Sequence, residues 1–166
     1  RYAARLATAD PEADLARAAE VGGRLVVPGD LEWPSQLDAL GDAAPWALWV
    51  RGTTDLRMSA LRSVAVVGSR AATRYGVDAA STLASDLASR GWTVVSGGAF
   101  GIDAAAHLGA LAVGGTTVAA LACGVDVAYP PRHDALFARI AADGLLVSEV
   151  PPGAAPHRTR FLIRNR

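Results

Sequence analysis

Val64-Ala65-Val66-Val67-Gly68-Ser69-Arg70 is the stretch of this 166-residue chain that decides the fold. Four apolar residues, three of them β-branched, predict a short buried strand over residues 64–67, the central strand of the sheet. Because this strand turns through glycine toward a helical pattern near Tyr75, backbone N–H groups and a helix N-terminus lie at its carboxyl end, where phosphates are often held. Arg70 adds a positive charge with fork geometry. The stretch predicts an anion site at Gly68, Ser69 and Arg70. The alternative is that the glycine is needed only for the backbone shape of the turn from strand to helix.

From Ser63 onward, strand and helix patterns alternate along the chain. Strands are predicted at residues 64–67, 93–96, 117–121 and 145–148, and helices at 75–90, 103–113 and 134–142. Strands without polar alternation indicate a parallel sheet that is covered on both faces. Right-handed crossovers place every loop that follows a strand at one edge of that sheet. We therefore predict an α/β fold with a mostly parallel sheet, helices on both faces and an N-terminal extension.

The N-terminal extension is predicted over residues 1–62, packed on the sheet edge, and residues 63–166 form the main domain. The elements predicted within the extension are a helix over 10–20, strands at 24–27 and 47–50, and a short helical piece over 33–40. Asp10 and Pro11 suit the start of that helix. The chain begins with Arg1 and stops just after a basic cluster, so we expect a fragment of a longer protein.

Composition and charge narrow the class of protein. The chain has 51% hydrophobic residues, no apolar run of membrane-spanning length and a single cysteine, Cys123. One cysteine excludes an intrachain disulfide framework, so a cytoplasmic setting is expected. The 16 basic residues, all arginine, balance 16 acidic ones. Four arginines nevertheless fall in the last nine residues with no acid among them, so the distribution says more than the total.

A second glycine-rich loop follows the strand over 93–96. It contains Ser96, Gly97, Gly98 and Gly101. Two such turns after adjacent parallel strands form a site where backbone N–H groups can approach a phosphate closely. The alternative is that these glycines let the following small-residue helix pack tightly, and both can hold. No G-x-G-x-x-G fingerprint follows the first strand, and there is no Gly-Lys-Ser/Thr phosphate loop.

Several reactive side chains lie near the same edge. Asp103 and His107 are four residues apart, and we expect a capping aspartate and a helix-surface histidine rather than metal ligands. Cys123 is expected to be a small buried packing residue. Glu149 is expected to pair with Arg70 and orient it. Spacing alone supports no catalytic serine, histidine and aspartate arrangement.

The terminal run from His157 to Arg166 is the most telling segment. Its Arg164-Asn165-Arg166 end follows an apolar triplet and looks like a helix start at the edge that carries the glycine loops. Guanidinium groups beside phosphate-binding loops suit an extended polyanion better than one small phosphate.

These features together resemble the DNA-processing protein A family, also called DprA or Smf. The resemblance covers about residues 23–166. It rests on Val-Gly-Ser-Arg at 67–70, Ser-Gly-Gly-Ala-x-Gly-Ile-Asp at 96–103 with Ala106-His107, Ala-Cys-Gly-Val-Asp at 122–126 with Tyr129-Pro130, Ser148-Glu149, and Arg-Asn-Arg at 164–166. A lead-in at Pro28-Gly29-Asp30, Trp33-Pro34 and Arg51-Gly52 fits as well.

The resemblance implies a Rossmann-like domain over residues 63–166 that binds single-stranded DNA. It implies a role in natural transformation and recombination, in which the protein protects incoming strands and loads the recombinase RecA, and it implies a homodimer without cofactor or metal. The DNA-binding residues that it implies are Gly68, Ser69, Arg70, Ser96, Gly97, Gly98, Phe100, Gly101, Arg164, Asn165 and Arg166. Phe100 stands where many members have another, often basic, residue, so a base can stack there or the ring can be structural. Leu162 stands where proline is usual.

Two other classes of function stay open from the sequence. A nucleotide 5′-monophosphate phosphoribohydrolase has a related fold with similar glycine loops. That enzyme family has a Pro-Gly-Gly-x-Gly-Thr-x-x-Glu motif, whereas Cys123-Gly124-Val125-Asp126 stands here, so no catalysis is expected. The third possibility is a partner-binding module with a vestigial pocket.

Overall fold

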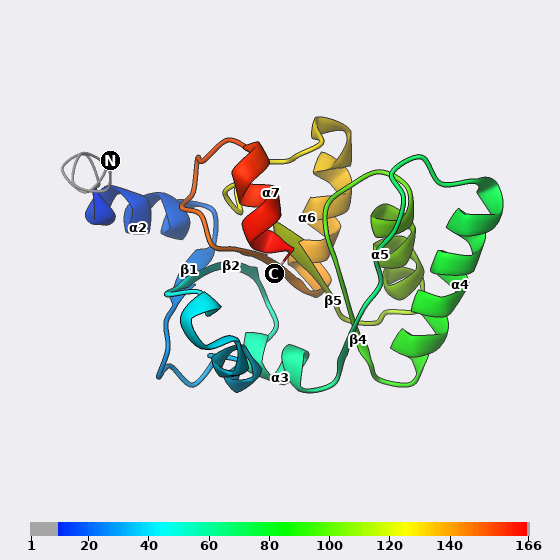
Figure 1. Cartoon of the computed structure of the whole chain (residues 1–166), viewed down its shortest axis with the longest axis horizontal. Coiled ribbons are helices and arrows are strands. Elements are labelled where there is room, and N and C mark those ends of the chain that lie inside the picture. The colour runs from blue at the N-terminus through cyan, green and yellow to red at the C-terminus, as the bar shows by residue number, and fades with distance from the viewer. Residues whose placement is uncertain (1–9, 166) are drawn as a thin grey trace.

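A single six-stranded sheet forms the centre of the computed structural model, which describes residues 10–165 (Figure 1). The strands lie in the order β1-β2-β6-β5-β4-β3. Their bounds are β1 Gly23–Val26, β2 Leu48–Gly52, β3 Ser63–Ala65, β4 Thr93–Ser96, β5 Thr117–Leu121 and β6 Leu145–Ser148. Strands β3 to β6 are parallel to one another, whereas β1 and β2 are antiparallel additions beside β6. The predicted mostly parallel α/β sheet is confirmed.

Helices cover both faces of this sheet. They are α2 Pro11–Glu20, α3 Leu56–Leu61, α4 Arg74–Ser89, α5 Ile102–Ala112, α6 Asp134–Asp143 and α7 Arg158–Arg164, with 3₁₀ helices η1 Ser35–Ala43 and η2 Pro131–His133. Helices α5 and α6 pack on one face, where Phe137 and Ile140 meet Leu146 of β6. On the other face, Trp33 and Leu56 of the N-terminal part meet alternate strand residues. No helix within residues 10–165 is both long and apolar enough to span a membrane.

The strand at the start of the Val64–Arg70 stretch is an edge strand, not a central one. Within residues 10–165, β3 pairs only with β4 and ends at Ala65, and Val67 is 71% exposed. The chain follows β4 for one more residue, because the Val66 N–H donates to the Val95 carbonyl oxygen, and then turns toward α4. The predicted buried strand over 64–67 is therefore wrong in place and length. An apolar run does not reveal how many neighbours a strand has.

The N-terminal part shares the main sheet. β2 aligns Trp49 with Ser148 and Val50 with Val147 of β6. Beside it, the Arg24 guanidinium makes a two-pronged ion pair with Glu32, at 2.6 and 2.7 Å. Residues 10–62 therefore extend the sheet on the side opposite β3, which leaves the β3–β5 edge loops open.

Small residues bring α4 and α5 close together. Gly109 of α5 is buried, and a Cβ on it would overlap the Ser81 carbonyl oxygen of α4. Ala106 and Ala110 are fully buried in the same core cluster. The small-residue helix thus packs tightly, as one of the two explanations for the second glycine-rich loop requires.

Candidate nucleic-acid interface

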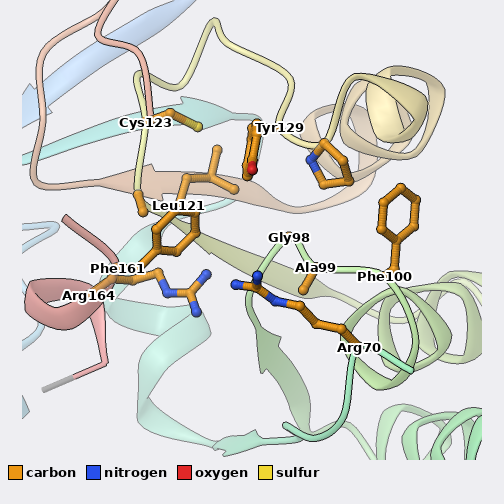
Figure 2. Close-up of a pocket in the computed structure, with 11 residues that line it drawn as sticks. Arg70, Gly98, Ala99, Phe100, Leu121, Cys123, Tyr129, Phe161 and Arg164 are labelled. Atoms are coloured by element: carbon orange, nitrogen blue, oxygen red, sulfur yellow. The ribbon is translucent and has the colours of Figure 1, made fainter. Parts of the chain in front are cut away.

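Three loops and one helix meet beyond the carboxyl ends of β3, β4 and β5. They are the loops at 66–73, 97–101 and 122–130, together with α7 (Figure 2). Two adjoining hollows lie among them. Both are open to solvent: one spans about 470 Å³ and is lined mainly by apolar and aromatic groups, and the other spans about 1270 Å³ beside the glycine loops. Arg70 and Arg164 line both hollows, so these two side chains stand at the boundary.

Both arginines place their guanidinium groups close to one aromatic ring. The guanidinium carbons of Arg70 and Arg164 are 5.6 and 5.4 Å from the centre of the Phe161 ring (Figure 2). Each contact is within the range of a cation–π interaction. Arg70 is exposed in the middle of its loop, whereas Arg164 is partly buried. Arg70 projects from the loop after β3, and Arg164 projects from the last turn of α7.

Burial and neighbours set the charge environment of Arg164. Desolvation lowers the pKa of its guanidinium, Asp103 opposes that shift, and Arg70 adds to it as a like charge. The Asn165 side-chain oxygen accepts from Arg164 Nε at 3.0 Å and from Nη2 at 2.8 Å. Because Arg164 is partly desolvated and close to another cation, binding of an anion beside it is energetically favourable.

The glycine positions of the second loop have no room for a side chain. A Cβ on Gly97 would lie 2.6 Å from both Arg164 Nη1 and Asp103 Oδ2. A Cβ on Gly98 would lie 2.7 Å from the Phe137 ring. Gly101 has φ of 78° and forms the N-cap of α5. These glycines are required by close approach and by backbone conformation, so their geometric role is established by the structure.

The first loop docks onto the second. The Ile102 N–H donates to the Ser69 carbonyl oxygen at 3.2 Å, and a Cβ on Gly68 would meet the Ile102 side chain at 2.6 Å. Ser69 Oγ accepts from the Ala71 N–H at 3.2 Å and stays exposed. Ser96 is 3% exposed, and its hydroxyl donates to the Val66 carbonyl oxygen at 2.6 Å. The Ser96 hydroxyl thus ties the two loops together rather than facing outward.

Phe100 stands on the outer side of the apolar hollow. Its ring is 44% exposed and meets His133 edge-on, with ring centres 4.6 Å apart. His133 in turn lies with Nδ1 3.0 Å from the Gly98 carbonyl oxygen. Phe100 therefore keeps an exposed surface at the rim while its edge packs against the protein.

The terminal run forms a helix that ends at the arginines, rather than one that starts there. α7 begins after its N-cap His157 and ends at Arg164, with Asn165 as its C-cap. The expected helix start at 164–166 is therefore wrong, and Arg166 lies outside the described residues. A helix over 158–164 places Phe161 and Arg164 one turn apart, and this spacing would have pointed to Phe161.

Sequence reasoning also missed the apolar wall of the smaller hollow. Leu121, Tyr129 and Phe161 line it, and the Tyr129 and Phe161 rings lie 5.9 Å apart. Tyr129 belonged to a recognised motif, but no local pattern in the sequence predicts that it faces α7. That contact depends on where a segment 32 residues later returns to the sheet edge.

The other singled-out side chains serve the fold. His107 is fully buried beneath the second glycine loop, so the predicted surface position is wrong. Cys123 is 2% exposed as expected, and burial raises the pKa of its thiol to about 11.

The expected Arg70–Glu149 pair is not among the ion pairs of the described residues, which are Arg24–Glu32 and Arg74–Asp78. Residues 10–165 contain no cluster of three or more metal-ligating His, Cys, Asp or Glu side chains.

The chain is similar to known proteins over most of its length. The family model of DNA recombination-mediator protein A matches residues 24–166. A Mycobacterium tuberculosis protein named as a DNA processing protein DprA is 50% identical over 155 residues, which cover 87% of this chain and 40% of that protein. A Synechocystis protein named Smf is 39% identical over 145 residues, which cover 86% of this chain and 36% of that protein. This chain thus spans less than half the length of these relatives.

Two solved structures are similar over most of the chain. The X-ray structure of DNA processing protein A from Streptococcus pneumoniae has a TM-score of 0.77 at 34% identity, covering 90% of this chain and 52% of that one. DNA processing protein A from Helicobacter pylori has a TM-score of 0.72 at 32% identity, covering 86% of this chain and 63% of that one, and its structure concerns its single-stranded DNA binding mode.

Proposed function

Because the chain belongs to the DNA recombination-mediator protein A family, we propose that it binds single-stranded DNA at the carboxyl edge of its sheet. The observation that carries this proposal is that Arg70 and Arg164 lie close to the Phe161 ring and line one hollow together with Gly68 and Gly97 of the two glycine-rich loops. Two cations, the exposed backbone of the first loop and an aromatic wall match the two repeating parts of a single strand, its phosphates and its unstacked bases.

The two hollows divide these parts between them. Phosphates bind in the larger hollow, where Gly68, Gly97 and both arginines supply donors and positive charge. A base enters the smaller hollow against Phe161, Tyr129 and Leu121. Duplex DNA keeps its bases stacked inside, so it cannot place one there without unpairing. Base identity matters little, because the walls are aromatic and apolar and every base has a π-face.

The wider role rests on the family rather than on the site. Within the longer protein, we infer that this region acts in DNA recombination and natural transformation, protecting incoming strands in the cytoplasm and loading RecA onto them. A homodimer would place two such sites on one strand. The family's description as a recombination mediator supports the recombination part of this role.

We propose binding without catalysis. The Cys123 thiol stays protonated near neutral pH because burial raises its pKa, and the buried His107 ring is committed to the fold. The glutamate-bearing glycine motif of phosphoribohydrolases is missing from the sequence. Incubation with nucleoside 5′-monophosphates should release no free base beyond that released by a Gly68→Asp variant, and release above that control would favour the enzyme.

The test of DNA binding compares Arg70→Ala with the unchanged protein by fluorescence anisotropy. Labelled oligothymidylate should bind more tightly than a duplex, with an affinity that falls steeply between about 50 and 200 mM salt. Arg70→Ala should weaken binding by about 1.5–3 kcal/mol, the range for hydrogen bonds to charged groups. The melting temperature should hardly change, because Arg70 is exposed.

Arg74→Ala is the matched control, since Arg74 is an exposed arginine in the first turn of α4 and lines neither hollow. It should leave affinity for the single strand nearly unchanged. Tighter binding of the duplex, a flat salt response, or equal losses in the two variants would contradict the proposal.

A further inference from the structure

His107 is a fully buried polar side chain directly beneath the second glycine loop. Nε2 lies 2.8 Å from the Gly97 carbonyl oxygen, and Nδ1 lies 2.7 Å from Thr117 Oγ1. Both His107 and Thr117 are 0% exposed. The ring lines neither hollow, so it has no direct contact with a bound strand.

The chemistry of the partners fixes the position of the ring hydrogen. A carbonyl oxygen can only accept, so a neutral ring carries its hydrogen on Nε2 and donates it to Gly97. Nδ1 is then an acceptor that lies against the Thr117 hydroxyl. That hydroxyl is also 2.7 Å from the Val94 carbonyl oxygen, so its single hydrogen is shared between two acceptors. Burial lowers the pKa of His107 to about 4, which keeps the ring neutral near pH 7.

A second side chain of the same helix holds the other end of the loop. Asp103 lies one turn before His107 on α5, and its Oδ2 accepts from the Ala99 N–H at 3.2 Å. The Gly97 carbonyl and the Ala99 N–H are therefore both bonded from below by α5. Between them, the backbone passes so close to Arg164 that a Cβ on Gly97 would strike its guanidinium.

We propose that His107, oriented by Thr117, is a positioning residue for single-stranded DNA: its bond to the Gly97 carbonyl holds the 97–99 loop in the shape that faces Arg164 and the DNA phosphate. The inference rests on the proposed function. It assigns His107 no contact with the strand and no role in proton transfer.

The test uses His107→Leu, which removes the donor at similar size, and His107→Gln, whose side-chain amide can still donate to Gly97. Affinity for oligothymidylate should fall about tenfold in the leucine variant. This is the size of loss seen when a hydrogen bond that orients a binding group, without touching the ligand, is removed. It should recover in the glutamine variant. The slope of log affinity against log salt should stay unchanged, because no cation is removed.

Amide hydrogen exchange measures the stability of the 97–99 loop in the absence of DNA. Exchange of the Ala99 N–H should become about tenfold faster in His107→Leu and stay slow in His107→Gln. Ser59→Ala is the matched control. It also removes a hydrogen bond from a buried side chain to a backbone carbonyl oxygen, but in α3 and away from the loop. It should lower the melting temperature without changing DNA affinity or Ala99 exchange.

Nitrogen NMR of the unchanged protein covers the case in which the leucine variant does not fold. The ring hydrogen should be on Nε2, and a ring protonated only on Nδ1 would overturn the proposal. Wild-type affinity with slow Ala99 exchange in His107→Leu would overturn it too. If the unchanged protein binds no single strand, the proposed function fails instead, and the Ala99 exchange rates still decide whether His107 holds the loop.

Discussion

Gly97 shows how one absent methyl group sets the position of a charge. Its backbone lies where a Cβ would be 2.6 Å from both Arg164 Nη1 and Asp103 Oδ2. Real Cβ atoms do not come so near to other atoms, so a Gly97→Ala side chain must displace the guanidinium. We predict a loss of single-strand affinity of up to about 2 kcal/mol, comparable to a charge-assisted hydrogen bond, measured by anisotropy.

Gly76→Ala is the control for that substitution. The atoms nearest to a Cβ there are 3.5 Å away, which is an ordinary contact, and the residue lies in α4. Alanine should be neutral for DNA binding and should stabilise the helix by about 0.5–1 kcal/mol. Equal affinities for the Gly97→Ala variant and the unchanged protein would show that Arg164 does not contribute to binding from its present position.

Arg164 is predicted to neutralise a phosphate. Arg164→Ala should weaken single-strand binding and reduce the salt slope by about 0.7, the value expected per neutralised phosphate of a single strand. Arg158→Ala, at the exposed start of the same helix, should change the slope much less. An unchanged slope in Arg164→Ala would assign this arginine to structure, through its 3.5 Å contact with the Ala120 carbonyl oxygen.

At the scale of elements, α4 should tolerate local damage without losing the site. The Thr73 hydroxyl accepts from the Gly76 N–H and caps this helix, just after the first loop. Thr73→Ala should destabilise the protein by about 0.5–2 kcal/mol, the usual loss for an N-cap, measured by urea denaturation. Affinity in the folded fraction should persist, because Thr73 lines neither hollow. A large loss of affinity would show that the cap shapes the phosphate loop.

Elements with strong local signals could be predicted from sequence, whereas their neighbours could not. Helix α2 begins at Pro11 after its Asp10 cap, as the sequence indicated. The edge position of β3 could not be predicted, because it depends on β6 pairing with β2 from a distant part of the chain. The position of α7 was missed for a different, local reason, since His157 was not recognised as its N-cap.

The candidate site followed the same division. Glycine patterns located both loops, because close backbone approach leaves a direct mark on sequence. The side chains that the loops bring together, above all Phe161 and Tyr129, come from segments whose meeting depends on tertiary packing. His107 carried a visible spacing to Asp103, but its burial against Thr117 of β5 did not follow from that spacing.

At the scale of the whole molecule, the buried His107 ring should make stability depend on pH. Burial lowers its pKa to about 4, against about 6.5 in the unfolded chain. The unfolded state therefore binds more protons between these values, so the free energy of unfolding falls as the pH falls from about 6.5 to about 4. The loss approaches about 3 kcal/mol, at 1.36 kcal/mol for each pKa unit.

Urea denaturation across this pH range measures the effect, and His107→Gln is the variant that should abolish most of it. Glu32 acts at lower pH, because the hydrogen bonds from Arg24 lower the pKa of its carboxylate below the ordinary range. Its contribution is present above the ordinary carboxylate pKa and is lost as the pH falls through the lowered value. The two groups thus titrate in different windows. A glutamine variant that kept the full loss between pH 6.5 and 4 would show that other groups cause it.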